Sequence, residues 1–125
     1  MFPSKIVAEA LRAKECGFDS VWFADHFVST DPVDECSDTW VLLTAIDLKT
    51  KRVMLCSWVS DPFRRHPATI AQTVATLDRL TEGRTALGIG AGEEMNLTPY
   101  GISWDHPIAR LRESVTYVKA MARSE

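Results

Sequence analysis

Cysteine, histidine and long apolar runs are all scarce in this chain of 125 residues. The three cysteines, Cys16, Cys36 and Cys56, stand far apart and form no CxxC pair. An odd number at wide spacing argues against a disulfide framework and predicts a reducing, cytoplasmic setting. The three histidines are equally scattered and belong to no short ligand motif, so we expect no metal site.

A strong excess of one charge is also missing. The 14 basic and 17 acidic residues give a net charge of −3 and are mixed along the chain. Without a basic stripe, nucleic acid is not an expected partner. No apolar run approaches the roughly 20 residues of a membrane span, and Met1–Ser4 leads straight into an amphipathic pattern instead of a signal peptide. The composition, 46% hydrophobic and 25% charged, predicts one globular domain over residues 1–125.

Short apolar runs alternate with segments of helical periodicity. The expected strands, Ser20–Ala24, Val53–Val59 and Thr85–Ile89, begin roughly 32 residues apart, which is the length of a βα unit. Ser4 is the expected cap of a first helix that ends at Gly17, and Asp38 that of a helix over Thr39–Lys49. A third helix runs from Pro67 to Gly83, residues 96–104 form a loop, and the last helix begins at Asp105 and Pro107.

The predicted order is therefore α-β-α-β-α-β-α, with near-continuous apolar strands that favour a parallel sheet covered by helices. Two α/β architectures fit this order: an open doubly wound sheet, or part of a (β/α)8 barrel. A complete barrel needs about 250 residues. This chain has half that length and begins on a helix, where a barrel begins on a strand.

Polar residues follow two of the expected strands. Asp25 and His26 come after the first, and the stretch TALGIGAGEEMN (Thr85–Asn96) carries the third into a glycine-rich turn that ends on Glu93 and Glu94. The carboxyl ends of strands are where α/β proteins place their chemistry. The glycines remove side chains where a ligand or a second backbone comes close. A tight turn with two solvated acidic side chains fits the same sequence.

Three longer segments lie in register with one family. They are GFDSVWFADHF (Gly17–Phe27), HPATIAQTVATLDRLTEGR (His66–Arg84) and LGIGAGEEMNLTPYGISWDHPIARLRESV (Leu87–Val115). Together they resemble the luciferase-like monooxygenase superfamily, nearest to enzymes that use the deazaflavin coenzyme F420, such as methylenetetrahydromethanopterin reductases and F420-dependent dehydrogenases. The resemblance implies a TIM barrel with the flavin or deazaflavin at the carboxyl ends of its strands. Aligned in this way, the chain is an amino-terminal half barrel of about three βα units, and the first strand is missing.

The resemblance also implies roles for individual residues. His26 would face the ring system or the substrate, where it would polarise a carbonyl or take a proton. Glu93 matches an acid that donates or accepts a proton as hydride moves to or from the deazaflavin. A non-prolyl cis bond is expected between Trp58 and Val59. The implied cofactor contacts are Asp25, Ser57, Trp58, Val59, Ala91 and Gly92.

The resemblance predicts an oxidoreductase fragment that transfers hydride between reduced F420, or alternatively FMN, and a small organic substrate. An FMN-dependent monooxygenase fragment and a non-catalytic half barrel are the other interpretations. Some sugar-phosphate dehydrogenases of the family carry a Trp four residues after the active-site His, and Thr30 stands there instead. Most phosphate-holding residues of the family lie in the second half of the barrel, so we expect weak cofactor affinity.

Two further expectations come from the residues themselves. Arg64 and Arg65 precede the helix that begins at Pro67, where they either hold an anion or form a solvated loop. A half barrel exposes two open sheet edges, and exposed edges pair with other strands. We therefore expect a homo-oligomer that forms through these edges.

Overall fold

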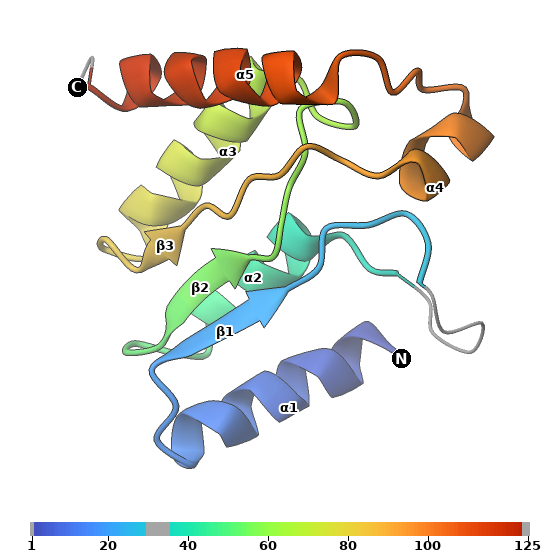
Figure 1. The fold of residues 1–125 in the computed structure, drawn as a ribbon. Helices are drawn as coiled ribbons and strands as arrows, with labels where there is room; N and C mark the ends of the chain where they lie inside the picture. The colour runs from blue at the N-terminus through green and yellow to red at the C-terminus, as the bar shows by residue number, and fades with distance from the viewer. Residues whose placement is uncertain (1, 30–35, 124–125) are drawn as a thin grey trace.

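The computed structural model describes residues 2–29 and 36–123 (Figure 1). Its helices and strands follow the predicted alternation, and a short helix and a 3-10 turn are inserted before the last helix. In chain order they are α1 (Pro3–Glu15), β1 (Ser20–Phe23), α2 (Thr39–Asp47), β2 (Met54–Ser57), α3 (Pro67–Leu80), β3 (Thr85–Ala86), α4 (Glu94–Leu97), η1 (Thr98–Tyr100) and α5 (Pro107–Ala122).

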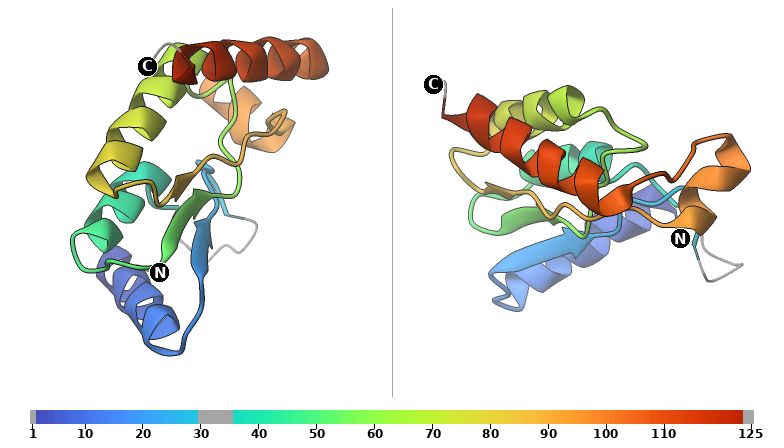
Figure 2. Two further views of the ribbon diagram at one scale, coloured as in Figure 1. Left: turned by 90° about the vertical axis from the view of Figure 1, so that its left-hand side faces the viewer. Right: turned by 45° about the horizontal axis from the view of Figure 1, so that its top comes forward.

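The strands form one parallel sheet in the order β1-β2-β3. Ser20 pairs with Met54 at the start of β1, and Leu55 pairs with Thr85 at the start of β3. Helices α1, α2 and α3 form an arc on one side of this sheet, as the left view of Figure 2 shows. This is the predicted α/β arrangement of a partial barrel, with its helices on the outside and its strands on the inside.

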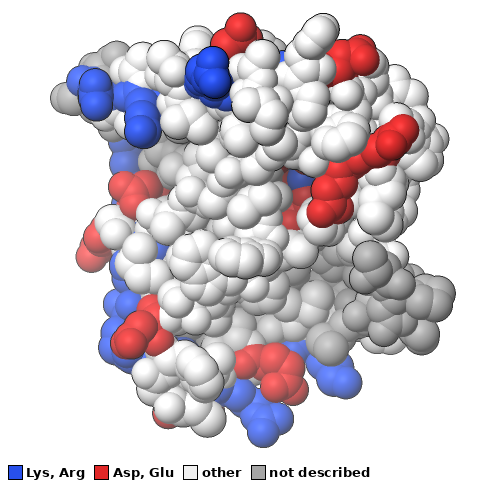
Figure 3. Space-filling model, viewed as in Figure 1, with Lys and Arg blue, Asp and Glu red and all other residues white. Residues whose placement is uncertain are grey.

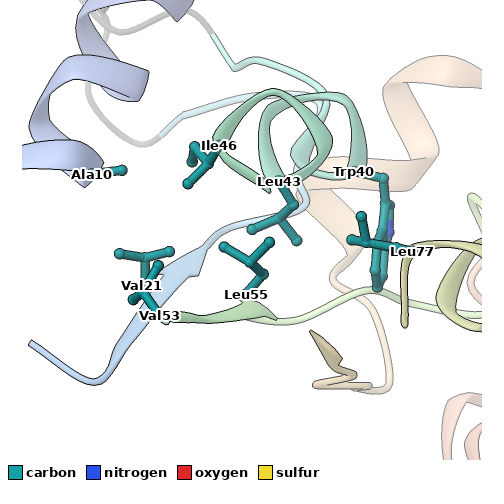
Figure 4. Close-up of a cluster of buried hydrophobic side chains, with 8 residues drawn as sticks. All are labelled: Ala10, Val21, Trp40, Leu43, Ile46, Val53, Leu55 and Leu77. Carbon is teal, nitrogen blue, oxygen red and sulfur yellow. The ribbon is translucent and has the colours of Figure 1, made fainter. Parts of the chain in front are cut away.

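The hydrophobic core lies between the sheet and this arc of helices (Figure 4). Alternate residues of a strand point to opposite faces, so Val21 and Leu55 reach the helices while Trp22 faces the other way and is 49% exposed. Leu43 and Ile46 lie fully buried on the inner face of α2. The whole cluster consists of Ala10, Val21, Trp40, Leu43, Ile46, Val53, Leu55 and Leu77.

Helix starts agree with the sequence where a side chain supplies the cap. The carboxylate of Asp38 accepts hydrogen bonds from the backbone N–H groups of Trp40 and Val41, as predicted. The Ser4 cap is wrong, because α1 begins at Pro3, whose fixed φ suits the first helical position. The last helix begins at Pro107 as predicted, but Asp105 does not cap it; its carboxylate accepts from Ser103.

The strands are shorter than predicted, and the predicted loop is partly helical. β2 ends at Ser57, and β3 keeps only Thr85 and Ala86. The chain beyond β3 still runs beside β2, with one isolated parallel bridge between Ser60 and Ile89. Residues 96–97 end α4 and residues 98–100 form η1, so the loop expected over residues 96–104 is wrong in its first half.

The three described cysteines form no disulfide bond and lie in different surroundings. Cys16 and Cys36 are exposed, whereas Cys56 is buried in β2, and burial raises the pKa of the Cys56 thiol. Within the described ranges no helix has the length and apolar character needed to cross a bilayer. The same residues contain no cluster of three His, Cys, Asp or Glu side chains placed to hold a metal ion.

Candidate functional site

A small pocket lies where the chain leaves the carboxyl ends of β1, β2 and β3. Its volume is about 160 Å³, and it is lined by His26, Val59, Asp61, Ala91, Gly92, Glu93 and Asn96. His26 arrives from the segment after β1, Val59 and Asp61 from the segment after β2, and the other four from the glycine-rich turn and α4. The parallel order brings these three segments to one edge, which is the edge where such sheets hold their ligands.

Asn96 ties the first of these segments to the third. Its side chain is buried, and its Oδ1 accepts hydrogen bonds from the backbone N–H groups of Phe27 and Val28, both at 3.1 Å. Its Nδ2 donates to Oε2 of Glu93 at 3.0 Å. His26 directly precedes the two bonded amides, so one amide group fixes both the His26 segment and the Glu93 carboxylate.

Behind the pocket, the carboxylate of Asp25 lies in a buried charge cluster. It accepts a hydrogen bond from Ser60 Oγ at 2.6 Å and forms ion pairs with Arg64 at 3.3 Å and Arg65 at 3.1 Å. Arg65 also pairs with Asp38. Burial alone would raise the pKa of Asp25, but the bonds from Ser60 and Arg65 and the charges of both arginines outweigh it and hold this pKa below its usual value.

The two arginines therefore hold carboxylates of the protein itself. Nε of Arg64 donates to Asp61 at 2.5 Å, and its guanidinium lies 5.1 Å from the centre of the Phe27 ring. The side chain of Arg64 is only 3% exposed. The solvated-loop alternative is wrong for Arg64, because the sequence does not reveal that Asp25 and Asp61 fold against it. The alternative that the pair holds an anion stays a prediction.

Of the other predicted contacts, Ser57 and Trp58 lie outside the pocket. The Ser57 hydroxyl donates to the carbonyl of Gly88 at 3.0 Å and accepts from its N–H at 3.1 Å, so it joins β2 to the chain after β3. Trp58 is exposed and meets Trp22 edge-on, with ring centres 5.7 Å apart. The bond between Trp58 and Val59 is cis, as the resemblance implied.

The structure thus brings five of the eight predicted site residues into one pocket: His26, Val59, Ala91, Gly92 and Glu93. Sequence reasoning missed two buried polar residues, Asp61 and Asn96, which complete its lining. Asp61 follows a predicted strand as Asp25 does, and that position was the available signal for it. The sequence offered no signal for Asn96, because this residue was assigned to a loop. Thr30 lies outside the described residues.

The pocket accommodates only a small part of a coenzyme. Complete small-molecule sites measure roughly 300–1,000 Å³, and this pocket is about 160 Å³. Its polar side chains are an imidazole, carboxylates and an amide, which suit a group that exchanges protons at a carbonyl or hydroxyl carbon. The described residues therefore fit the reacting edge of a ring system or a small substrate, and not a whole coenzyme.

Comparisons with known proteins identify the family of this chain. The family model for luciferase-like monooxygenases matches residues 3–125. An F420-dependent glucose-6-phosphate dehydrogenase of Kineococcus radiotolerans is 41% identical over 98% of this chain and 38% of its own length. A 5,10-methylenetetrahydromethanopterin reductase of Archaeoglobus fulgidus is 31% identical over 90% of this chain and 32% of its own length.

A solved structure gives the same result in three dimensions. An F420-dependent secondary alcohol dehydrogenase, in complex with an F420-acetone adduct, superposes with a TM-score of 0.85 at 35% identity and covers 98% of this chain. The chain spans 38% of that protein's length, and it corresponds to between 32% and 38% of each of these proteins. The match extends over nearly all of its residues, and the chain belongs to the luciferase-like monooxygenase family.

Proposed function

We propose that this chain forms the amino-terminal part of the active site of an oxidoreductase that moves hydride between coenzyme F420 and a small organic substrate. The observation that carries the proposal is the pocket that unites His26 and Glu93 at the carboxyl edge of the sheet. Support comes from relatives that are F420-dependent oxidoreductases by name. When bound, the deazaflavin would supply the hydride chemistry, and this chain would supply the protic groups.

His26 and Glu93 are suited to complementary tasks in such a reaction. Hydride leaving an alcohol carbon requires a base for the hydroxyl proton, and hydride entering a carbonyl carbon requires an acid. An imidazole serves either task near neutral pH. We assign the proton on the substrate oxygen to His26, and a proton-exchanging role beside the ring to Glu93. The buried Asp61 and Asn96 limit the volume open to water on their side of the pocket.

Glu93→Gln tests this assignment. The amide keeps the size of the side chain but exchanges no proton, so turnover with F420 should fall roughly 10²- to 10⁴-fold while coenzyme binding changes little. Turnover is followed by the visible absorbance of the deazaflavin, and binding by its fluorescence. Glu94→Gln is the matched control, because Glu94 is the neighbouring exposed acid and does not line the pocket. Equal turnover in wild type and Glu93→Gln would contradict the role, and activity with FMN alone would support the monooxygenase interpretation.

We also propose that the chain self-associates through its exposed sheet edge and the adjoining open face of the sheet. The exposed Trp22 and Trp58 meet on this face, and Figure 3 shows mostly uncharged atoms across its centre. Among the described residues no further strand pairs with the outer edge of β1. Apolar surface and unpaired backbone groups of this kind favour pairing with another copy.

Sedimentation velocity at micromolar concentration checks this proposal. We expect a dimer or larger species in the wild type and a shift toward monomer in Trp58→Ser. The substitution removes an exposed indole whose apolar surface would be buried against the second copy. Leu48→Ser removes a comparably exposed apolar side chain at the end of α2, outside this face, and should leave the sedimentation pattern unchanged. A wild-type monomer would refute the proposal.

A further inference from the structure

The side chain of Asn96 is the one described link between the segment that carries His26 and the carboxylate of Glu93. Its Oδ1 accepts from the amides of Phe27 and Val28, and its Nδ2 donates to Glu93. Phe27 and Glu93 lie on different loops, after β1 and after β3. Asn96 is only 2% exposed, so water does not compete freely for these bonds.

The amide of Asn96 matches each of these partners. The two backbone groups donate, so they require an acceptor, and the carboxylate accepts, so it requires a donor. Reversing the amide would place its NH2 against two N–H groups and its oxygen against the carboxylate, which opposes all three bonds. Aspartate would keep the acceptor for Phe27 and Val28 but would repel Glu93. Leucine would leave two backbone donors without a partner.

We propose that Asn96 is a positioning residue that couples the ionisation of Glu93 to the segment holding His26. The hydrogen bond from Nδ2 is strongest when Glu93 is ionised, since a charged acceptor roughly doubles the strength of a hydrogen bond. Hydrogen bonds in a chain polarise one another. A change at Glu93 is therefore transmitted through the amide to the N–H groups of Phe27 and Val28, which adjoin His26.

The significance attached to this coupling rests on the proposed function, in which His26 and Glu93 act on one substrate. In hydride transfer the two groups exchange protons at different atoms, so their states must be matched during turnover. Asn96 supplies a connection that does not touch the reacting atoms. It fixes the orientation of Glu93, which lines the pocket, by holding Oε2.

Nuclear magnetic resonance of the ¹⁵N-labelled chain tests the coupling without any coenzyme. We expect the Asn96 side-chain NH2 signals and the backbone amide signals of Phe27 and Val28 to shift together in one titration step as the pH is lowered. Glu93→Gln should remove that step from all three residues. Glu94→Gln should retain it, because Glu94 makes no described contact with Asn96. These substitutions lie at exposed positions, so the fold is expected to survive.

Two variants of Asn96 separate its two roles. Asn96→Leu should expose the Phe27 and Val28 amides to hydrogen exchange roughly five- to tenfold faster, through the loss of one hydrogen bond each. Asn96→Asp should keep their protection but alter the titration step. The absence of a step shared by all three residues in the wild type, or a shared step that persists in Glu93→Gln, would overturn the inference whatever the activity assay shows. A step lost only in Glu93→Gln supports it even if no F420 turnover is found.

Discussion

Replacing Asp25 with alanine should destabilise the fold by about 3–5 kcal/mol, which is the cost of leaving buried charges without their partner. The Asp25 carboxylate is 2% exposed and compensates Arg64 and Arg65. After its removal Arg64 keeps Asp61 and Arg65 keeps Asp38, but the bond from Ser60 is also lost. Because domains are stable by only about 5–15 kcal/mol, we expect a large decrease in the urea midpoint.

Asp19→Ala is the matched control for this experiment. Asp19 also pairs with an arginine, Arg52 at 3.2 Å, but its side chain is 95% exposed. Exposed pairs contribute little, so the midpoint should stay close to wild type. Asp25→Asn keeps the shape and gives a second measurement if the alanine variant does not fold. A loss below about 1 kcal/mol in both Asp25 variants would mean that the cluster is solvated like a surface pair.

The pH dependence of stability gives an independent check on Asp25. Its pKa is lower in the folded state than in the unfolded chain, where it is about 3.9. Its contribution is therefore fully present above the unfolded pKa and is lost as the pH falls through the folded pKa. The stability difference between wild type and Asp25→Asn should be constant near neutral pH and should shrink below about pH 4. A difference that grows on acidification would contradict the lowered pKa.

The sequence predicted the fold well where periodicity and capping act locally. The strand positions follow from the short apolar runs that contain Val21 and Leu55, and the start of α2 follows from Asp38. The missed features are long-range. Neither the pairing of Asp25 with Arg64 nor the reach of Asn96 back to Phe27 leaves a local trace, because each joins residues about 40 or 70 positions apart.

The glycine-rich turn shows why the site was only partly predictable. Its glycines indicated a close approach by either a ligand or a second backbone, and the sequence left the two open. At Gly88 the approaching group is the backbone of β2: an added Cβ would lie 2.2 Å from the carbonyl oxygen of Ser57. At Gly90 it is the side chain of Val59, with Cγ2 at 2.6 Å. Gly88 and Gly90 therefore allow the turn to pack against β2 and the residues after it.

Gly88→Ala should consequently have the second large effect on stability. The neighbouring carbonyl oxygen belongs to the backbone and has little room to withdraw, since Gly88 is fixed by two bonds with Ser57 and one from the N–H of Ser60. Overpacking costs about 1–3 kcal/mol, occasionally more, and each strand bond that breaks adds roughly 0.5–1.5 kcal/mol. We expect a total of at least about 3 kcal/mol in urea unfolding.

Substitutions at two other glycines separate the two causes of destabilisation, close packing and backbone conformation. Gly90→Ala meets the side chain of Val59 and no backbone atom, so it should be less damaging than Gly88→Ala. Gly17→Ala has open space around its Cβ but a φ of +90°, so it should cost only the roughly 1–2 kcal/mol of a left-handed non-glycine residue. If Gly17→Ala were as damaging as Gly88→Ala, backbone conformation and not close packing would dominate at the turn. The expected order, with Gly88 first, instead requires that β2 and the chain after β3 are in contact. That contact is also what holds Val59 and Glu93 against one pocket.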